Sequence, residues 1–240
     1  MYEDYYNKFY KELAKIDDKN NSFEKIKYFL PIIKGKEKII DIGCGHGSVS
    51  HELIKRGLDV YGIEINDDAL INLKEKGFKI IKKDITQPFK INDKFNIALL
   101  LDVLEHVFDP ISLLAETKNI ISPDGYVIIS VPLYFDLLDR IKILFTGNII
   151  SMDNLCYGKE NYKKFRTFNY DHIRFFRPNE IIELGRQLNL KLDKVEYFPI
   201  FYLGSNIILK IILKILSNRI TARLYPNLLA HSMKVRWKVS

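Results

Sequence analysis

The stretch Lys38-Ile-Ile-Asp-Ile-Gly-Cys-Gly-His-Gly47 decides how the chain folds. Its first half is a short run of β-branched residues, which is typical of a buried strand, and its second half has a glycine at every other position. The sequence from Ser48 to Arg56 is helix-like and stops at Gly57. A strand, a glycine loop and a helix in this order are the start of a βαβ unit.

The same alternation continues after this stretch. Further strands are expected over 58–64, 78–82, 95–101 and 126–131, with helices over 66–76 and 110–121 and a turn at Pro123-Asp124-Gly125. Residues 95–101 and 126–131 are apolar at nearly every position, as expected of parallel strands buried on both faces. The pattern predicts an α/β fold with a doubly wound, Rossmann-like, mostly parallel sheet.

The elements beyond Pro132 are less regular. Helices are expected over 133–145, 178–188 and 204–217, and a strand is expected over 190–197. Residues 232–239 alternate with a period of two, which predicts a half-exposed strand, antiparallel and at or near a sheet edge. Lys234, Arg236 and Lys238 of this strand are expected to point outward.

Composition and charge limit the classes of function. With 47% hydrophobic and 28% charged residues the chain is neither disordered nor collagen-like. The net charge of +7 is dispersed along the chain, so it permits an anionic partner without requiring one. Cys44 and Cys156 cannot make a disulfide scaffold, no apolar stretch reaches the roughly 20 residues of a membrane span, and the N-terminus lacks a signal-peptide core. A cytoplasmic protein is expected.

The glycine loop lies where an open α/β sheet binds ligands, beyond the carboxyl ends of its strands. Glycines let the backbone approach a ligand, and the start of the following helix offers N–H groups to an anion. Glu64, at the end of the next strand, is placed to accept two hydrogen bonds from ribose hydroxyls. Ser48 stands where the dinucleotide fingerprint needs Gly or Ala, so the loop suits a small carboxylate better than a pyrophosphate.

The sequence resembles the class I S-adenosylmethionine-dependent methyltransferases, closely over 36–132 and more loosely over 178–240. Within that family it is similar to the small-molecule, quinone-biosynthesis O-methyltransferase-like branch. The resemblance implies a methyltransferase with S-adenosyl-L-methionine as cofactor, and a seven-stranded sheet in which the reversed strand 232–239 is inserted before the sixth. It rests on motifs that occur in order at Ile39–Gly47, Glu64, Lys83-Asp84-Ile85, Leu101–Val107 and Ser122–Tyr126.

The resemblance also assigns a cofactor site. It implies that Glu64 binds the ribose, that Asp84 lies on the adenine side and that the segment from Leu101 lines the methionine end. His106 is expected to pack above the cofactor, and Cys44 to act as a small filler residue. The cofactor-binding set expected from the resemblance is Asp41, Gly43, Cys44, Gly45, Gly47, Glu64, Ile65, Asp84, Ile85, Leu101, Asp102 and His106.

The protein does not need to activate the methyl donor, because the methyl group of a sulfonium is already electrophilic. The acceptor must be held in line at about 3–3.5 Å, water must be excluded, and a hydroxyl acceptor must lose its proton. His172 is the candidate catalytic residue, since similar His-x-x-Phe-Phe-x-Pro segments close over the transfer site in small-molecule members of the family. The alternative is that His172 caps the following helix or braces the aromatic loop. Asp102, Glu105 and His106 are the other candidates.

A metal site is the competing interpretation of these side chains. Asp102, Glu105 and His106, with His172 added, combine carboxylate oxygens and imidazoles. Magnesium-dependent relatives have Glu where this chain has Asp102, and metal-free relatives carry the same Asp-x-Leu-Glu-His string. We therefore expect no metal.

The sequence predicts a single methyltransferase domain over 1–240, with N-terminal helices over 1–35, a cofactor-binding core over 36–132 and substrate-lid inserts over 133–177 and 198–230. The inserts are apolar and basic. They either cover a small hydrophobic or lipid- or glycan-linked acceptor, with contact to a membrane surface, or bury against each other as core or dimer interface.

Two other functions stay open. RNA methylation is the runner-up, because the basic and aromatic stretch 159–166 could stack bases, although the chain has no RNA-binding module. A DNA partner is not expected. A non-catalytic, cofactor-binding interaction subunit is the third interpretation. The sequence does not decide which acceptor atom is methylated, nor the oligomeric state.

Overall fold

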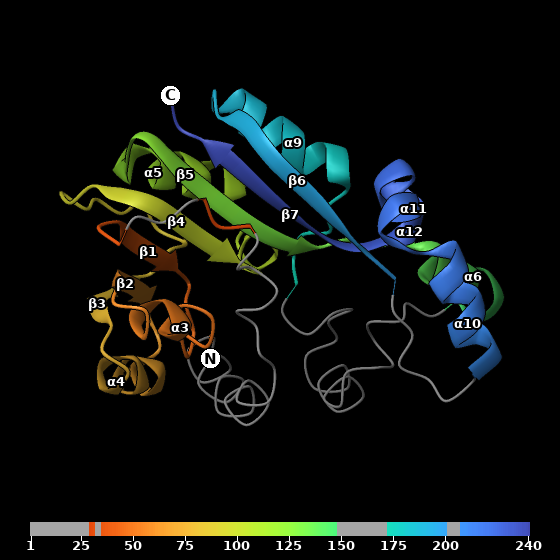
Figure 1. Ribbon diagram of the computed structural model, residues 1–240, viewed down its shortest axis with the longest axis horizontal. Coiled ribbons are helices and arrows are strands. Elements are labelled where there is room, and N and C mark those ends of the chain that lie inside the picture. The colour runs from red at the N-terminus through yellow and green to blue at the C-terminus, as the bar shows by residue number, and fades with distance from the viewer. Residues whose placement is uncertain (1–28, 32–34, 148–171, 201–206) are drawn as a thin grey trace.

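The structure is a computed structural model that describes residues 29–31, 35–147, 172–200 and 207–240. Its centre is a seven-stranded sheet in the order β3-β2-β1-β4-β5-β7-β6 (Figure 1). The strands are β1 (Lys38–Ile42), β2 (Asp59–Glu64), β3 (Lys79–Lys82), β4 (Phe95–Leu101), β5 (Ile121–Pro132), β6 (Lys191–Pro199) and β7 (Ala230–Lys238). Strands β1 to β5 pair in parallel, and β7 pairs antiparallel with both β5 and β6. The doubly wound sheet with one reversed strand is confirmed.

Helices cover both faces of this sheet. On one face α3 (His51–Ile54) and α4 (Asp67–Glu75) bury Leu53 and Leu73 against the sheet. On the other face α5 (Pro110–Ile120) and α9 (Pro178–Gln187) bury Leu114 and Ile181. A second group of helices lies at one end of the sheet (Figure 1). It consists of α6 (Leu137–Thr146), α10 (Ile207–Leu216), α11 (Arg219–Leu224) and α12 (Pro226–Leu229).

Local signals fix several helix starts where the sequence predicts them. The side chain of Asn66 accepts a hydrogen bond from the backbone N–H of Ala69 and caps α4. Asp109 caps α5 through the N–H of Ser112, and Pro110 occupies the first turn, where its missing N–H costs nothing.

Three predicted boundaries are wrong. The helix expected over 48–56 is shortened to α3, because residues 48–50 and 55–57 on either side of it form turns. The helix expected from 133 begins only at Leu137, after Asp136 has capped it through two backbone N–H groups. The turn at 123–125 does not interrupt β5. The strand pairing between β4 and β5 shifts here, from Phe95 opposite Ile121 to Ile97 opposite Tyr126. Residues 122–125 are therefore an irregularity within one strand.

The last strand lies between β5 and β6, as the resemblance predicts for the reversed strand, and it is next to the edge strand β6. Lys234 is buried, with Nζ 4.5 Å from the ring centroid of Phe198, while Arg236 and Lys238 are half-buried and ion-paired. The outward orientation predicted for these residues is therefore wrong for Lys234, whose ammonium packs over the ring of Phe198 of β6.

Several expectations lie outside the described residues. They concern most of the N-terminal helices 1–35, Cys156 and the basic and aromatic stretch 159–166. The division into core and lid inserts stays a prediction. Among the helices in the described part of the chain, none is long and apolar enough to cross a membrane.

Candidate functional site

The glycine loop after β1 has a left-handed backbone at all three glycines, with φ of 67° at Gly43, 52° at Gly45 and 68° at Gly47. The backbone N–H of Gly43 donates to the carbonyl of Ile63 at 2.9 Å, which ties the loop to the end of β2. A Cβ on Gly47 would lie 2.4 Å from the ring of Phe78. This glycine therefore serves packing as well as loop shape.

Glu64 lies directly beneath this loop. Its Oε2 accepts a hydrogen bond from the N–H of Gly45 at 2.9 Å, and its Oε1 accepts from the N–H groups of Ile65 at 2.7 Å and Asn66 at 2.9 Å. The side chain is only 3% exposed. A carboxylate has about four lone-pair sites, and these N–H groups take three of them, so Oε2 keeps one site for a hydroxyl of a ligand. The loop and the acid that the spacing predicted to act together are in contact.

Asp41 is buried behind the loop and does not face solvent. The hydroxyl of Ser50 donates to its Oδ2 at 2.6 Å and so links the end of β1 to the start of α3. Burial raises the pKa of Asp41 to about 7, against the opposing effect of the Ser50 hydrogen bond and with a further rise from the charge of Glu64. In this arrangement Asp41 stabilises the glycine loop through its hydrogen bond with Ser50.

Cys44 packs inside the same loop. Its Sγ lies 2.9 Å from where a Cβ on Gly62 would stand, so the thiol fills the space left by that glycine. Burial raises the pKa of Cys44, and the negative charges of Asp41 and Glu64 raise it further. The side chain therefore stays a neutral thiol at ordinary pH, which does not favour nucleophilic chemistry.

The other predicted cofactor residues follow the ends of β3 and β4. Asp84 accepts hydrogen bonds from the N–H and hydroxyl of Thr86 at 2.8 and 2.6 Å. The Cδ1 of Ile85 lies 3.3 Å from where a Cβ on Gly43 would stand, so Ile85 lies against the glycine loop. Asp102 follows Leu101 with a φ of 55°, and its Oδ1 accepts from the hydroxyl of Ser130 at 2.8 Å. These side chains line the same edge of the sheet, as the carboxyl ends of parallel strands must.

A second cluster lies after β4, in the short helix η1 (Leu104–His106). Glu105 is 1% exposed, and its Oε1 lies 4.0 Å from the Nε2 of His106 and 4.0 Å from the Nε2 of His172. The two imidazole rings are 4.6 Å apart between centroids. The structure therefore brings together three of the candidates, and leaves Asp102 turned toward β5.

Backbone contacts hold His172 in place. The N–H groups of Ile173 and Arg174 donate to the carbonyl of Glu105 at 2.9 and 3.1 Å. The hydroxyl of Tyr134 contacts the Nδ1 of His172, and its ring packs edge-on against Phe175 with centroids 4.7 Å apart. Sequence reasoning missed Tyr134. Its position two residues after β5, at the edge where the other candidates lie, is the signal that could have identified it.

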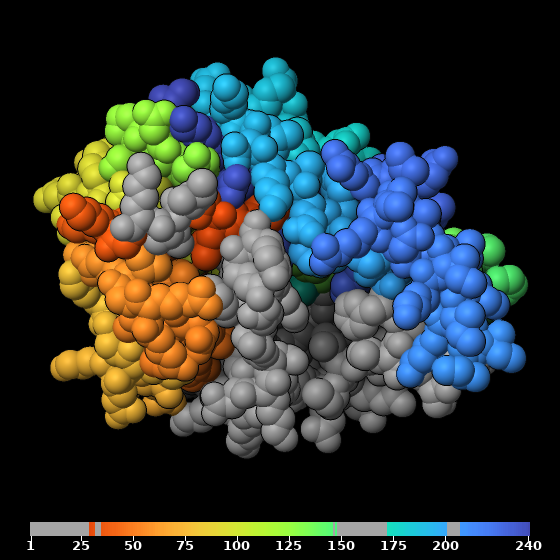
Figure 2. All heavy atoms as spheres, viewed as in Figure 1, coloured from red at the N-terminus to blue at the C-terminus, as the bar shows by residue number. Residues whose placement is uncertain are grey.

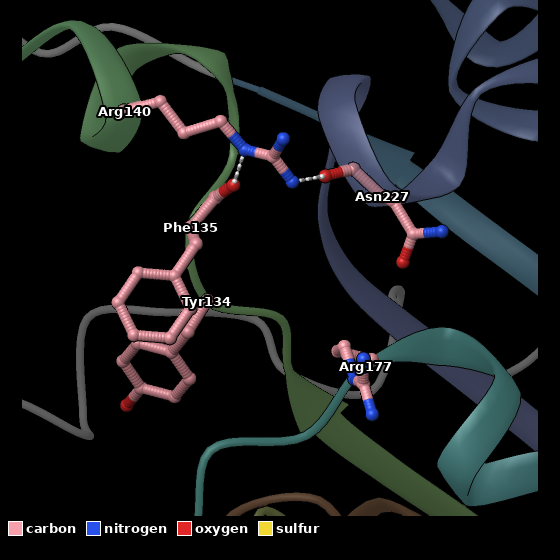
Figure 3. A pocket seen from close by; sticks show the side chains of 5 residues that line it. All are labelled: Tyr134, Phe135, Arg140, Arg177 and Asn227. Atoms are coloured by element: carbon pink, nitrogen blue, oxygen red, sulfur yellow. Dashed lines mark hydrogen bonds between the residues drawn. The ribbon is translucent and has the colours of Figure 1, made fainter.

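Tyr134 also lines a cavity of about 370 Å³. Figure 3 shows the rings of Tyr134 and Phe135 beside each other, with the guanidinium of Arg140 reaching toward Asn227 and that of Arg177 at the start of α9. Arg140 donates to the carbonyls of Phe135 at 2.6 Å and Asn227 at 3.0 Å. Carbonyls do not neutralise its charge, so the cavity combines aromatic rings with a positive charge.

Glu105, His106 and His172 could also hold a metal ion. Each offers one ligand atom, and these atoms lie within 4.8 Å of one another. One carboxylate and two imidazoles suit zinc, iron or manganese better than magnesium, which prefers oxygen ligands. The predicted fourth member, Asp102, is bonded to Ser130 instead.

Comparison with known proteins gives the family. A sequence profile of a methyltransferase domain matches residues 8–195 of this chain. The chain belongs to the methyltransferase family. This methyltransferase is 26% identical over 185 residues to the ubiquinone biosynthesis O-methyltransferase of Aliivibrio fischeri, which covers 71% of this chain and 74% of that protein. It is also 26% identical over 211 residues to the same enzyme of Actinobacillus pleuropneumoniae, covering 79% of this chain and 85% of that one.

Solved structures agree on the fold of the methyltransferase. A protein of Thermotoga maritima, described as a S-adenosylmethionine-dependent methyltransferase, superposes with a TM-score of 0.63 at 16% identity, over 100% of this chain and 98% of that one. A S-adenosylmethionine-dependent methyltransferase of Archaeoglobus fulgidus gives 0.58 at 18% identity, over 90% and 92%. The chain is a class I S-adenosylmethionine-dependent methyltransferase, as its motifs predict.

The site of the methyltransferase fits S-adenosylmethionine. The left-handed loop, the buried carboxylate of Glu64 and the acids after β3 and β4 line one edge of the sheet, which is the edge where open α/β sheets bind ligands. Glu64 would hold the ribose, Asp84 with Ile65 and Ile85 the adenine side, and Leu101, Asp102 and His106 the methionine end. The N-terminus of the helix after the glycine loop, which was expected to bind an anionic group of the ligand, is displaced from residue 48, because α3 begins only at His51. The role of each residue stays a prediction.

We expect Glu64→Ala to weaken S-adenosylmethionine binding about tenfold or more. The variant loses a charge-assisted acceptor, which contributes about 1.5–3 kcal/mol, and it also releases the N–H of Gly45. Isothermal titration calorimetry measures the change. The exposed Glu75 of α4 provides the matched control, since Glu75→Ala removes the same charge away from the loop. Equal affinities of the two variants would show that Glu64 does not bind the ribose.

Proposed function

We propose that this methyltransferase transfers the methyl group of S-adenosylmethionine to a hydroxyl of a small hydrophobic acceptor, either free or linked to a lipid or glycan. The observation that carries the proposal is the position of His172. It lies between the buried carboxylate of Glu105 and the hydroxyl of Tyr134, which also lines the cavity. A base beside an aromatic cavity is what an O-methyltransferase needs.

The cavity favours a ring or an apolar chain in the acceptor. Its volume of about 370 Å³ suits a small organic molecule, since ligand pockets range from about 300 to about 1,000 Å³. Tyr134 and Phe135 offer aromatic surface. Arg140, which forms no ion pair with another described residue, favours an acceptor that carries a carboxylate or phosphate near its ring. The relatives in two bacteria that are named ubiquinone biosynthesis O-methyltransferases are consistent with oxygen as the methylated atom.

The cofactor, when bound, supplies the electrophilic methyl group. The protein then has to remove a proton from the attacking hydroxyl. We infer that His172 takes this proton on Nε2, in the tautomer whose Nδ1–H donates to the hydroxyl oxygen of Tyr134 and leaves Nε2 free to accept. The resulting imidazolium would lie 4.0 Å from the carboxylate of Glu105, whose negative charge stabilises it. Tyr134 packs edge-on against this imidazole with ring centroids 5.8 Å apart, and Phe175 packs against Tyr134 in turn.

The test is an acceptor screen with methyl-labelled S-adenosylmethionine. The panel contains diphenols with and without a carboxylate, lipid-linked saccharides and RNA transcripts. We expect label in the small-molecule or lipid fraction. Label that appears only in RNA would favour the runner-up function, and cofactor binding without any transfer would favour an interaction subunit.

We expect Tyr134→Ala to raise the KM of the accepted substrate about 10- to 100-fold, because the acceptor loses a buried aromatic contact worth about 1.5–3 kcal/mol. Tyr134→Phe is the matched control, since it keeps the ring and removes only the hydroxyl. This variant should keep the KM near the wild-type value. The affinity for S-adenosylmethionine should be unchanged in both. A KM that does not respond to Tyr134→Ala would place the acceptor elsewhere.

A further inference from the structure

Helix α10 exposes an unusually apolar surface. Its sequence, Ile-Ile-Leu-Lys-Ile-Ile-Leu-Lys-Ile-Leu from 207 to 216, turns by about 100° per residue. Leu213 is its buried residue, and the opposite side is formed entirely by exposed isoleucines. These are Ile207, Ile208, Ile211, Ile212 and Ile215. Soluble helices normally place charged residues on this side.

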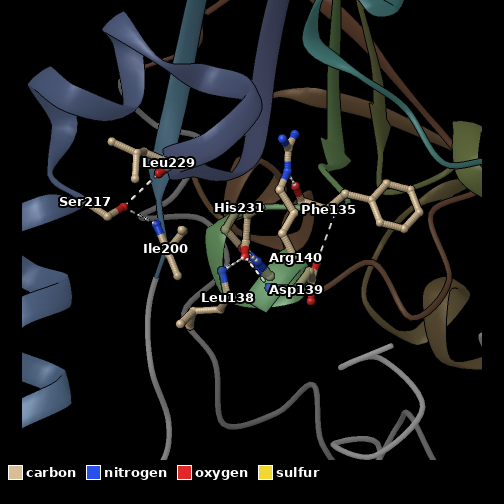
Figure 4. A network of polar contacts seen from close by, with 9 residues as sticks. Phe135, Leu138, Asp139, Arg140, Ile200, Ser217, Leu229 and His231 are labelled. Carbon is tan, nitrogen blue, oxygen red and sulfur yellow. Dashed lines mark hydrogen bonds and ion pairs between the residues drawn. The ribbon is translucent and has the colours of Figure 1, made fainter. Parts of the chain in front are cut away.

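The orientation of α10 is fixed by its C-terminal end. Figure 4 shows the buried hydroxyl of Ser217 between Ile200, at the end of β6, and Leu229, before β7. This hydroxyl accepts from the N–H of Ile200 at 2.7 Å and donates to the carbonyl of Leu229 at 2.7 Å. Together with buried Leu213, these bonds hold the isoleucine side of α10 outward.

Other helices at this end of the sheet also expose apolar side chains. In α6, Leu144 and Phe145 are 78% and 80% exposed, and in α11, Ile220 and Leu224 are 72% and 66% exposed. Figure 1 places α6, α10 and α11 at the same end of the sheet, and Figure 2 shows the atoms of α10 and α11 on the outer surface there. We call the exposed side chains of these three helices the apolar end surface. A patch of this kind on a soluble protein marks an interaction site.

The charged residues of α10 and α11 have one sign. Residues 207–225 contain Lys210, Lys214, Arg219 and Arg223 and no acidic residue. Arg219 forms an ion pair with Glu196 of β6 at 3.7 Å. Lys210 and Lys214 lie four residues apart along one border of the isoleucine side, between it and the buried side. Apolar side chains bordered by lysines match the boundary between lipid tails and anionic headgroups.

We propose that the apolar end surface docks the protein on an anionic lipid bilayer, with the isoleucines of α10 at the level of the acyl chains and Lys210 and Lys214 among the headgroups. A second copy of the chain fits less well. A symmetric dimer would pair the same patch on both subunits and bring these lysines together without an acidic partner in 207–225. A span is excluded for α10, whose ten residues reach about 15 Å against a hydrocarbon core of about 30 Å.

Docking in this way would bring the cavity close to the membrane. Arg140, which lines the cavity, belongs to α6, and its guanidinium donates to Asn227 of α12. The helices that form or adjoin the apolar end surface therefore also line the cavity. The docking proposal does not depend on the acceptor, because it rests on the surface alone.

Flotation with vesicles tests the proposal without measuring turnover. We expect the full chain to float with vesicles of phosphatidylglycerol and phosphatidylcholine in equal parts, and to bind pure phosphatidylcholine at least tenfold more weakly. The double variant Ile208→Asn, Ile215→Asn should lose at least tenfold in binding to the mixed vesicles. The matched control is Ile71→Asn, which changes an exposed isoleucine of α4 on the far part of the sheet and should bind like wild type.

Charge reversal separates the two contributions. Lys210→Glu with Lys214→Glu should weaken binding to the mixed vesicles at least tenfold, whereas Lys74→Glu with Lys90→Glu, the same change in net charge on exposed residues elsewhere, should have a smaller effect. Unchanged melting temperature and S-adenosylmethionine affinity show that the variants are folded. Wild-type protein that stays in the unbound fraction, or α10 variants that float like wild type, would overturn the proposal. So would a dimer in sedimentation velocity that the isoleucine variant converts to a monomer.

Discussion

Replacing His172 by alanine should lower kcat by about 10²–10⁴-fold and leave the affinity for S-adenosylmethionine unchanged. The hydroxyl of the acceptor would lose the proposed base. Among the described residues, His172 has the only imidazole that contacts Tyr134 and also lies 4.0 Å from Glu105. Steady-state kinetics with the identified acceptor measures kcat, and isothermal titration calorimetry measures the affinity for S-adenosylmethionine.

A chelator separates a base from a metal ligand. We expect EDTA to leave wild-type turnover unchanged, since Asp102 is bonded to Ser130 and does not complete the set. The matched variant is His106→Ala, whose ring lies beside His172 and contacts the same carboxylate. It should cost much less activity than His172→Ala if His172 is a base. Turnover that vanishes in EDTA and returns with magnesium, manganese or zinc, with both histidines equally costly, would show instead a metal held by Glu105, His106 and His172.

The glycine loop and its acid could be predicted because both are local signals. A β-branched run, alternating glycines and an acid at the tip of the next strand are read directly from the sequence, and parallel strands force their carboxyl ends to one edge. Gly45 and Glu64 are therefore in contact although they are nineteen positions apart. Asp84 and Asp102 were assigned to this edge by the family resemblance.

The contact between Tyr134 and His172 could not be predicted in this way. These residues are 38 positions apart, and they meet because the carbonyl of Glu105 fixes the segment after His172. Such a contact depends on how irregular segments dock, which periodicity does not encode. The burial of Lys234 has a related cause. The period-two pattern of residues 232–239 predicts a strand. The exposure of Lys234 depends on the contact of its ammonium with Phe198 of β6, which this pattern does not encode.

The character of the inserts was also open from sequence. An apolar helix such as α10 could have buried itself in a core or stayed exposed, and composition is the same in both cases. The structure leaves one residue of α10, Leu213, buried and its isoleucines exposed. The described residues therefore do not bury this helix in a core. The lipid bilayer proposed above would cover its exposed side.

Asp41→Asn should change how the stability of the protein depends on pH. Burial raises the folded-state pKa of Asp41 to about 7, whereas an unfolded aspartate titrates near 3.8. Between these values the folded state keeps the proton and the unfolded state has lost it, so the free energy of unfolding must fall as pH rises from about 4 to about 7 and then level off. A difference of about three units corresponds to a loss of up to about 4 kcal/mol.

Asparagine stays neutral at every pH and can still accept the hydrogen bond from Ser50, so the variant should lose this part of the slope. We expect urea unfolding, without cofactor, to show similar stabilities of the two proteins at about pH 4.5 and a variant that is more stable by up to about 4 kcal/mol at about pH 8. Asp68→Asn, on the exposed first turn of α4, is the control and should follow the wild type. If wild type and Asp41→Asn lose stability in parallel between these two pH values, Asp41 is ionised in the folded protein. The charge behind the glycine loop would then be available to attract the cationic cofactor, and Asp41 would act in binding as well as in bracing the loop.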